Sequence, residues 1–415
     1  MESIQPCDEA LLSRLDTHLR SQGYSQSTIY QDVFEARRFL KYLADRNIAI
    51  EAVKPVDVSQ YLRCELRRHS RRHGHPPRSR THWRSLHASC VHMLLRVIIG
   101  RWPPISVPAT PREVFQQQIR HEYAQWLSTV RGLVPVSIDQ LSREAGRFVA
   151  WLGERCDPER MPQLTGEAIE AYLTFRAPSL CRRSQQSMAQ HLCTFLRYLH
   201  TAGRVNRDLA QFIVTPTLYG FETIPSALRA EEVQAVVETT RQDGSAKGLR
   251  DYAILLLLST YGLRQSEITH LRLEDVHWRT ETLIIRHSKT GTESCLPLLA
   301  SVGEAILAYL RTGRPKTSVR EIFLRAYAPY RPLHSLYELI QGRLREAKVR
   351  PAGKRGPHSF RHARAASLLS ADISIKQIGD ILGHRSAAAT MTYLKLATKA
   401  LRNIALEIPG EVASS

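Results

Sequence analysis

Six side chains suited to phosphoryl chemistry occur in one order along the chain: Arg264, Lys289, His358, Arg361, His384 and Tyr393. Together they supply three fixed cations, two imidazoles and one phenol. An arginine fork can clamp two non-bridging phosphate oxygens, while lysine and histidine can move protons near neutral pH. A site that breaks and rejoins a DNA phosphodiester without a metal needs side chains of these types. Each residue alone also fits an ion-pair, turn or core role, so the interpretation rests on the whole set.

The surroundings of the first two residues predict exposed turns. A glycine two positions before Arg264 is expected to end a buried helix, so that Arg264 projects from a tight turn. Glu267, three residues further on, could orient the guanidinium. Lys289 is expected at the tip of a hairpin between strands at 282–287 and 294–298.

The next four residues lie in a predicted helical region. His358 and Arg361 are three apart at a helix start, just after a proline, and can therefore reach one phosphate from the same face. His362 is expected to face elsewhere and to be structural. His384 and Tyr393 are separated by about two and a half helical turns, so a turn between them has to bring the phenol back toward the phosphate.

The charge balance indicates a polyanionic partner. The chain carries 58 Lys+Arg against 39 Asp+Glu, which gives a formal net charge of +19. Such chains usually meet nucleic acid, because each neutralised phosphate releases counterions. A basic protein with solvated faces is the alternative, and charge alone does not separate DNA from RNA.

Other bulk features point to a cytoplasmic protein. No apolar run is long enough to cross a membrane, and the first residues lack the basic-then-apolar order of a signal peptide. The seven cysteines are scattered without a C-x-x-C pair. This pattern favours free thiols in a reducing cytosol and disfavours a zinc knuckle.

Proline clusters divide the chain into three segments, 1–101, 113–215 and 226–410. The first two segments resemble one another. Each has an amphipathic helix that ends in Arg-Phe-apolar-x-aromatic-Leu, at 25–43 and 137–152, followed by a Tyr-Leu pair and a third helix. We expect two tandem helical bundles that arose by duplication, with chance similarity as the alternative.

The third segment mixes helix with a little strand. Besides the hairpin, 322–324 could add an edge strand. Helices are expected at 229–240, 249–260, 333–347, 358–369, 375–382 and 387–396. The fold class is therefore mainly α, with a small antiparallel sheet in the last segment.

Residues 63–84 are expected to form a loop with eight arginines, four histidines and Trp83. Arginines beside an aromatic side chain suit backbone phosphates or insertion into a groove. A solvated basic face is the alternative, and zinc is disfavoured because the histidines lack partners at ligand spacing. The candidate DNA-binding residues are Arg67, Arg68, Arg71, Arg72, Arg78, Arg80, Arg182 and Arg183.

The six residues and their neighbours closely resemble the catalytic domain of the tyrosine recombinase (phage-integrase) family. The matching stretches are YGLRQSEITHLRLEDV at 261–276, SKTGTESCLPL at 288–298, HSFRHARAASLL at 358–369 and IGDILGHRSAAATMTYLK at 378–395. The resemblance covers about 226–400 and includes the intervals between the motifs. No catalytic position is replaced, which argues against an inactive homologue.

This resemblance implies a mechanism. Tyr393 would attack the scissile phosphate to form a 3′-phosphotyrosyl bond and release a 5′-hydroxyl, so rejoining needs no ATP. Arg264 and Arg361 would stabilise the pentavalent phosphate. Lys289 would protonate the leaving oxygen, His358 would assist proton transfer, and the second histidine of the set would hydrogen-bond a phosphate oxygen. Neither a metal nor a cofactor is implied.

The resemblance also implies domain roles and partners. Residues 113–215 resemble the family's core DNA-binding domain, a SAM-like helical bundle, and 1–101 an accessory or arm-type DNA-binding domain. Residues 226–410 would be the catalytic domain. Its apolar tail, 394–410, is expected to dock into a neighbouring subunit and link a tetramer around two double-stranded DNA sites. The alternative for the tail is packing on its own domain.

The biological setting that the resemblance favours is a bacterial mobile-element recombinase, cytoplasmic and associated with the nucleoid. Accessory recombinases or DNA-bending proteins could assist it. Two other functions stay open. A type IB topoisomerase uses the same chemistry to relax supercoils, and a DNA-binding regulator or architectural protein would explain the charge and the bundles. No motif in the sequence names the DNA site or selects among integration, excision, inversion and resolution.

Overall fold

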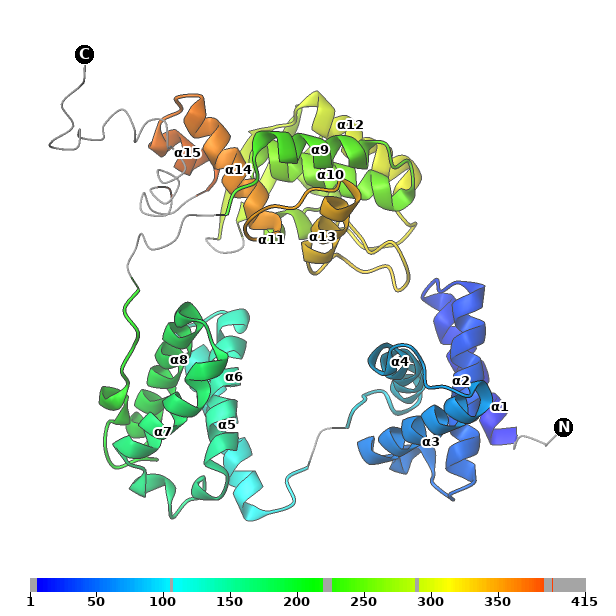
Figure 1. The fold of residues 1–415 in the computed structure, drawn as a ribbon, viewed down its shortest axis with the longest axis vertical. Coiled ribbons are helices and arrows are strands. Elements are labelled where there is room, and N and C mark those ends of the chain that lie inside the picture. Colours follow the sequence, from blue (N-terminus) through cyan, green and yellow to red (C-terminus); the bar gives the residue numbers. More distant parts are fainter. Residues whose placement is uncertain (1–5, 105–106, 219–225, 288–290, 384–389, 391–415) are drawn as a thin grey trace, which may run out of the picture. The chain divides into compact units, whose positions relative to one another are not determined.

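The computed structural model describes residues 6–104, 107–218, 226–287, 291–383 and 390 (Figure 1). Among these residues helices predominate, and the strands form one small antiparallel sheet. This confirms the predicted, mainly α fold class. One compact unit lies within Ile105–Glu222, and the other contains the N-terminal bundle and the last segment. Among the described residues, the N-terminal bundle and the second bundle each have one hydrophobic cluster, and the last segment has two.

Four helices form the N-terminal bundle: α1 (Pro6–Ser21), α2 (Gln26–Ala44), α3 (Pro55–His73) and α4 (Arg80–Ile99). Apolar residues at three- and four-residue spacing bury one face of each helix, as Leu12, Leu15 and Leu19 do on α1. Local signals define the helix ends. The Ser25 hydroxyl caps α2 by accepting a backbone N–H of its first turn, and Gly74, at φ +71°, ends α3.

The arginine-rich stretch at 63–84 is helical at both ends, so the predicted loop is wrong. α3 runs on to His73 and α4 begins at Arg80, which leaves only 74–79 as a turn. Arginine has a high helix propensity. In addition, the buried residues Tyr61 and Glu65 attach one face of α3 to the core, and the helix continues from that anchored turn.

A buried polar unit links α2 to α3. The Tyr61 hydroxyl donates to Glu35 Oε2 over 3.4 Å, and its ring meets Phe39 edge-on with centroids 5.0 Å apart. Arg38 Nη1 pairs with Glu35 Oε1 at 3.2 Å. Burial acts to raise the pKa of Glu35, but hydrogen bonding from His87 and the charge of Arg38 outweigh it and lower the pKa. Glu35 is therefore a carboxylate inside the bundle at neutral pH.

The second bundle contains α5 (Pro111–Thr129), α6 (Pro135–Leu152), α7 (Gly166–Arg176) and α8 (Arg182–Thr201). It repeats the buried unit of the first. The Tyr172 hydroxyl of α7 donates to Glu144 of α6 over 2.5 Å, and its ring meets Phe148 edge-on at 5.0 Å. Arg147 pairs with Glu144 at 2.9 Å. The same four residue types occupy corresponding places on the second and third helices of both bundles, which supports the predicted duplication.

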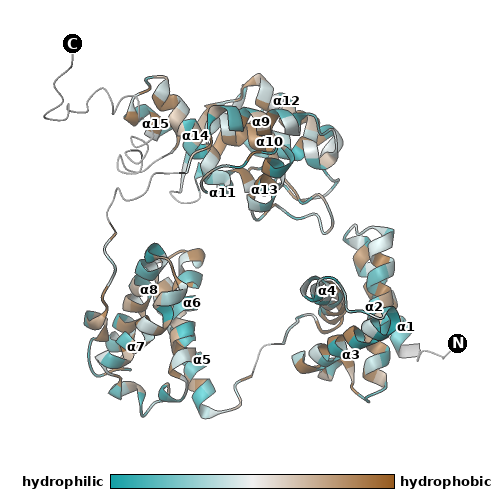
Figure 2. Cartoon of the chain, viewed as in Figure 1, coloured by the Kyte–Doolittle hydropathy of each residue, from teal (hydrophilic) through white to brown (hydrophobic). Residues whose placement is uncertain are grey.

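The last segment contains α9 (Ala230–Arg241), α10 (Ala246–Tyr261), α11 (Gln265–Thr269), β1 (Val276–His277), β2 (Thr282–His287), β3 (Thr292–Pro297), α12 (Ala300–Ala308), α13 (Tyr337–Glu346), α14 (Pro357–Ser370) and α15 (Ile375–Ile381). A π-helical turn, Tyr309–Gly313, extends α12. Helix α10 is buried on most sides and appears largely brown in Figure 2, so it forms the centre of this core.

The sheet has the order β1-β2-β3, and both of its pairings are antiparallel. The predicted hairpin is confirmed, with His287 paired to Thr292 at its closed end. The predicted edge strand at 322–324 is wrong. Leu324 makes only an isolated bridge to Pro332, and the run is apolar because it is completely buried in the core.

Most predicted helices of this segment are confirmed to within a few residues of their ends. The exception is 387–396, which, apart from Thr390, lies outside the described residues. α12 was missed, because its alanines and glycine give a weak amphipathic pattern. Short 3₁₀ turns occur at Ile50–Ala52, Gly153–Arg155, Met161–Gln163, Ala177–Ser179, Leu209–Phe212 and Leu273–Asp275.

Candidate active site

Arg264 occupies the N-cap position of α11, three residues after the end of α10. α10 ends because Gly262 adopts a left-handed conformation, with φ +65° and ψ 30°. Glu267 holds Arg264 at two points. Its Oε1 accepts Arg264 Nη1 at 2.7 Å and its Oε2 accepts the Arg264 backbone N–H at 2.6 Å. The orientation of Arg264 by Glu267, suggested by their spacing, is therefore present in the structure.

Glu267 is a buried carboxylate, with 1% of its side chain exposed. Burial acts to raise the pKa of Glu267, but hydrogen bonds from His287 and Arg264 outweigh it and hold the pKa below its ordinary value. The group is therefore negatively charged at neutral pH, as an orienting partner for an arginine has to be.

Arg361, on α14, lies close to Arg264, because both contact residues just after the end of α15. It is 3% exposed. Its Nη1 donates to the Gly262 carbonyl at 2.7 Å and its Nη2 donates to the Leu382 carbonyl. Arg264 Nη2 donates to the next carbonyl, that of Gly383, at 2.9 Å. The two predicted arginines are thus brought together where the end of α10 meets the end of α15.

This arrangement favours an anionic ligand. Two guanidiniums meet at neighbouring carbonyl groups, and Glu267 pairs with that of Arg264. Arg264 keeps 20% of its side chain exposed, so it can contact a ligand at the surface. Arginine forks match the geometry of phosphate oxygens.

His358 and His362 lie on successive turns of α14, with ring centroids 6.2 Å apart. Burial, together with the positive charge of His358, Arg361 and Lys354, lowers the pKa of His362 to about 4. His362 is therefore neutral at physiological pH, which fits the structural role predicted for it. His358 is exposed on the first turn of the helix, where it is open to a ligand.

Lys289, His384 and Tyr393 lie outside the described residues, so their roles stay predictions. The residues on either side of 288–290 are described. The Gly291 backbone N–H donates to the His287 carbonyl over 2.8 Å.

One residue of the site was missed by the sequence analysis. His287 Nδ1 lies 2.8 Å from Glu267 Oε1, and its Nε2 lies 2.7 Å from Ser294 Oγ. A sequence signal for it exists. Alternation along β2 puts Leu283, Ile285 and His287 on its buried face, and a histidine in that series has to find polar partners.

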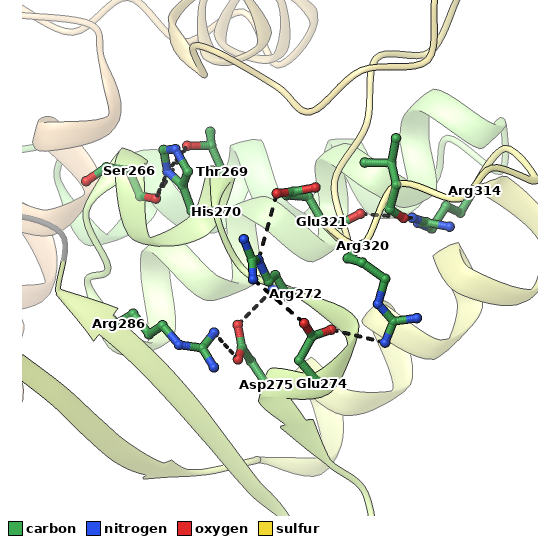
Figure 3. Close-up of polar contacts among 11 residues, drawn as sticks. Ser266, Thr269, His270, Arg272, Glu274, Asp275, Arg286, Arg314, Arg320 and Glu321 are labelled. Atoms are coloured by element: carbon green, nitrogen blue, oxygen red, sulfur yellow. Dashed lines mark hydrogen bonds and ion pairs between the residues drawn. The ribbon is translucent and has the colours of Figure 1, made fainter. Parts of the chain in front are cut away.

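The neighbouring residue on β2 faces the other way. Figure 3 shows Arg286 pointing toward Asp275, which is buried in the turn before β1. The Arg272 backbone N–H donates to the other oxygen of Asp275 at 2.8 Å. Arg320 pairs with Glu274 of the same turn at 3.1 Å. These contacts attach β2 to the turn at 272–275 and so define which face of the strand His287 occupies.

The eight candidate DNA-binding arginines are all exposed: Arg67, Arg68, Arg71, Arg72, Arg78, Arg80, Arg182 and Arg183. Arg68 also pairs with the buried Glu65 at 3.0 Å, so part of its charge is neutralised within the bundle. Trp83 lies against the histidines of α3 and α4, with its ring centroid 6.0 Å from His69 and 4.0 Å from His87.

Three further properties concern the described part of the chain. It contains no group of three or more His, Cys, Asp and Glu side chains able to hold a metal ion. Its six described cysteine side chains are free, which confirms the predicted thiols at those positions. None of its helices combines the length and apolar character needed to span a membrane.

Comparison with known proteins agrees with the family that the sequence motifs indicate. Residues 226–400 match the model of the phage integrase family. The chain is 56% identical over 192 residues to a putative integrase/recombinase of Sinorhizobium fredii, an overlap of 46% of this chain and 100% of that protein. It is 27% identical over 289 residues to the tyrosine recombinase XerC of Pelobacter propionicus, an overlap of 69% and 93%.

Solved structures with a similar fold also include recombinases. XerH site-specific recombinase, in a post-cleavage complex with its palindromic difH substrate, matches with a TM-score of 0.55 and 15% identity over 70% of this chain and 87% of that one. A lambda integrase tetramer bound to a Holliday junction matches with a TM-score of 0.50 and 16% identity over 74% and 85%. At these identities the likeness is one of fold.

Proposed function

The chain belongs to the phage integrase family and is a tyrosine recombinase that breaks and rejoins DNA strands in site-specific recombination, and on this premise we propose that it acts through a 3′-phosphotyrosyl intermediate. Tyr393 is the proposed nucleophile. Its phenolic oxygen bonds to the scissile phosphorus as the bond to the 5′-oxygen breaks, and that oxygen leaves as a hydroxyl. Attack by a 5′-hydroxyl on the phosphotyrosyl bond reverses the step and rejoins the strand.

One observation carries this proposal. Arg264 and Arg361 are held at the consecutive carbonyls of Gly383 and Leu382, immediately before His384. Cations held in place before the reaction stabilise the extra negative charge of a pentavalent phosphate without reorganising. Both arginines therefore act as fixed electrophilic groups in the proposed mechanism.

Three side chains complete the proposed chemistry. Lys289 protonates the leaving 5′-oxygen, His358 assists proton transfer, and His384 hydrogen-bonds a phosphate oxygen. The exposed position of His358 on the first turn of α14 supports its part. In this mechanism the fixed cations take the place of the divalent ions that two-metal nucleases use.

We propose that the two N-terminal bundles bind duplex DNA. We assign core DNA binding to 113–215, accessory DNA binding to 1–101 and catalysis to 226–410. The repeated buried unit and the exposed arginines at the start of α4 and α8 support equivalent tasks for the two bundles. The net charge of +19 is consistent with long contact along a phosphate backbone.

We also propose an assembly and a setting. Residues 394–410 dock into a neighbouring subunit, so that four protomers hold two DNA sites, as a lambda integrase tetramer holds a Holliday junction. The similarity to a putative integrase/recombinase supports the integration and excision of a mobile element. The substrate is then nucleoid DNA in a bacterial cytoplasm, with accessory recombinases or DNA-bending proteins as further partners.

Covalent capture tests the mechanism. Wild-type protein, Tyr393→Phe and the control Tyr327→Phe, which alters an exposed tyrosine, are each incubated with supercoiled plasmid and fragmented bacterial DNA. Protein–DNA adducts are then denatured, captured and sequenced. We expect adducts at a defined site from the wild type and the control only. Adducts from Tyr393→Phe at the wild-type level would refute this nucleophile.

The same experiment separates the other two functions. Adducts at scattered positions together with plasmid relaxation, but without sequence-specific product joints, would support a type IB topoisomerase. Tight DNA binding without adducts from any variant would favour a DNA-binding regulator. Recombinant joints at the captured site would exclude both.

A further inference from the structure

We propose that His287 is a positioning residue that fixes the guanidinium of Arg264 from two sides, through Glu267 and through Gly383. The inference rests on the proposed function, in which Arg264 stabilises the reacting phosphate. His287 would not touch the DNA. Its contribution would be to set where Arg264 points.

The contacts form a closed ring. Arg264 Nη1 donates to Glu267 Oε1 at 2.7 Å, and the same oxygen lies 2.8 Å from His287 Nδ1. On the other side, Arg264 Nη2 donates to the Gly383 carbonyl at 2.9 Å. The His287 ring packs against that glycine so closely that a Cβ on Gly383 would lie 2.7 Å from His287 Cε1. The two residues that accept hydrogen bonds from Arg264 therefore both lie beside one imidazole.

The chemistry of the groups defines the direction of the contact to Glu267. A carboxylate can only accept, so Nδ1 of His287 carries a proton and donates it to Glu267. Nε2 makes the second hydrogen bond of the ring, to the Ser294 hydroxyl 2.7 Å away, which can donate or accept. The side chains of His287 and Glu267 are 5% and 1% exposed, so water has little access to replace a lost contact. Loss of the Nδ1 donor would remove one of the contacts that hold Glu267 in place, and Arg264, which donates to the same oxygen, would be fixed less firmly.

The imidazole also contacts the second strand of the hairpin, through Nε2 and Ser294 Oγ, but the backbone pairing of the hairpin does not involve the ring. The closing hydrogen bond of that turn runs between the main-chain groups of Gly291 and His287, and a substitution leaves it in place. The ladder between β2 and β3 is likewise formed by backbone groups. The contact to Ser294 therefore has to be separated from the contacts around Arg264 by the choice of substitution.

Two substitutions of similar chemistry separate the contacts. His287→Asn puts an amide N–H near the place of Nδ1 and keeps the donation to Glu267. His287→Gln puts its amide near the place of Nε2, so it keeps the contact to Ser294 and loses the one to Glu267. His277→Gln alters an exposed histidine on the neighbouring strand β1 and serves as the matched control. Thermal unfolding of each full-length variant checks that it is folded.

The first readout needs no DNA. The full-length proteins are treated with phenylglyoxal, which modifies arginine, and the rate at Arg264 is followed by peptide mass spectrometry. We expect this rate to rise several-fold in His287→Gln, to stay closer to the wild type in His287→Asn and to be unchanged in His277→Gln. An Arg264 rate in His287→Gln equal to that of the wild type would overturn the proposal, as would equal rates in the two His287 variants.

The second readout is covalent adduct formation on the captured site. In His287→Gln we expect it to slow about ten-fold, the low end of what is lost when a residue that orients a functional ligand is removed. DNA affinity should not change. His287→Asn should restore part of the rate. If the wild type itself forms no adducts, the proposed function fails, while the order of the Arg264 modification rates still decides the role of His287.

Discussion

Arg264 and Gly383 are 119 residues apart in the sequence and are joined by a hydrogen bond of 2.9 Å from Nη2 to the carbonyl oxygen. Gly383 has φ +63°, a left-handed conformation in which a side chain is strained. The imidazole of His287 fills the space that a side chain there would need. The bond therefore depends on glycine for both its backbone conformation and its room.

Gly383→Ala should consequently damage the site more than the fold. We expect a loss of about 1–3 kcal/mol in the free energy of unfolding from the strained backbone, together with a large fall in covalent adduct formation. Urea denaturation and the capture assay measure the two effects. Gly203→Ala is the matched control, because Gly203 has φ +65° and a Cβ there would meet no atom within 4 Å. Adduct formation at the wild-type rate in Gly383→Ala would contradict this account.

Arg361→Lys should abolish most of the reaction. A lysine has one charged nitrogen, so it cannot donate to both the Gly262 and Leu382 carbonyls and also present a fork to phosphate. We expect a fall of about 10²–10³ in the rate of adduct formation. The matched control is Arg345→Lys, at an exposed position on α13. If both variants react like the wild type, Arg361 has only a structural role.

The stability of the segment that contains α14 should depend on His362 below neutral pH. Its folded pKa of about 4 lies below the ordinary value of 6.5, so the unfolded chain binds the proton first. Stability is therefore complete above about pH 6.5 and falls as the pH drops toward 4. For this partly exposed ring we expect about 1–3 kcal/mol after solvent screening. His362→Gln should lose less stability than the wild type between pH 7 and pH 4.5 in urea denaturation. Parallel losses in the two proteins would count against the prediction.

The two bundles should respond alike to loss of their buried tyrosine hydroxyl. Tyr61→Phe and Tyr172→Phe each leave a buried glutamate without one donor, at a cost of about 1–3 kcal/mol. Tyr172→Phe should cost more, because its hydrogen bond is 2.5 Å against 3.4 Å for Tyr61. Hydrogen exchange of each bundle in the full-length protein measures the effect.

A matched control comes from the second bundle. Among the described residues the buried hydroxyl of Tyr123 has no hydrogen-bond partner. Tyr123→Phe should therefore be neutral or slightly stabilising, since it removes an unsatisfied polar group. A cost as large as that of Tyr172→Phe would show that the effect comes from packing and not from the hydrogen bond to Glu144.

The sequence by itself determined the local helices and strands and the types of reactive side chain that the chain carries. The repeated Arg-Phe ending, the alternation along β2 and the glycine after α10 each act within a few residues, so periodicity and backbone preference were enough to predict two helical bundles, a hairpin and a turn that presents Arg264. The order of arginines, histidines and tyrosine was likewise enough to indicate the family, because it depends on residue types and intervals alone.

Only the tertiary structure decided how these parts meet. The pairing of Arg361 with Gly262 and Leu382, and the inclusion of His287 in the ring around Arg264, join residues that are tens to about a hundred positions apart. No local preference encodes such contacts, because they arise when separate helices and a strand pack around one core. The arginine-rich stretch at 63–84 is an intermediate case. Arginine favours a helix locally, and the packing of Tyr61 and Glu65 against α2 adds a tertiary contribution that no local pattern shows.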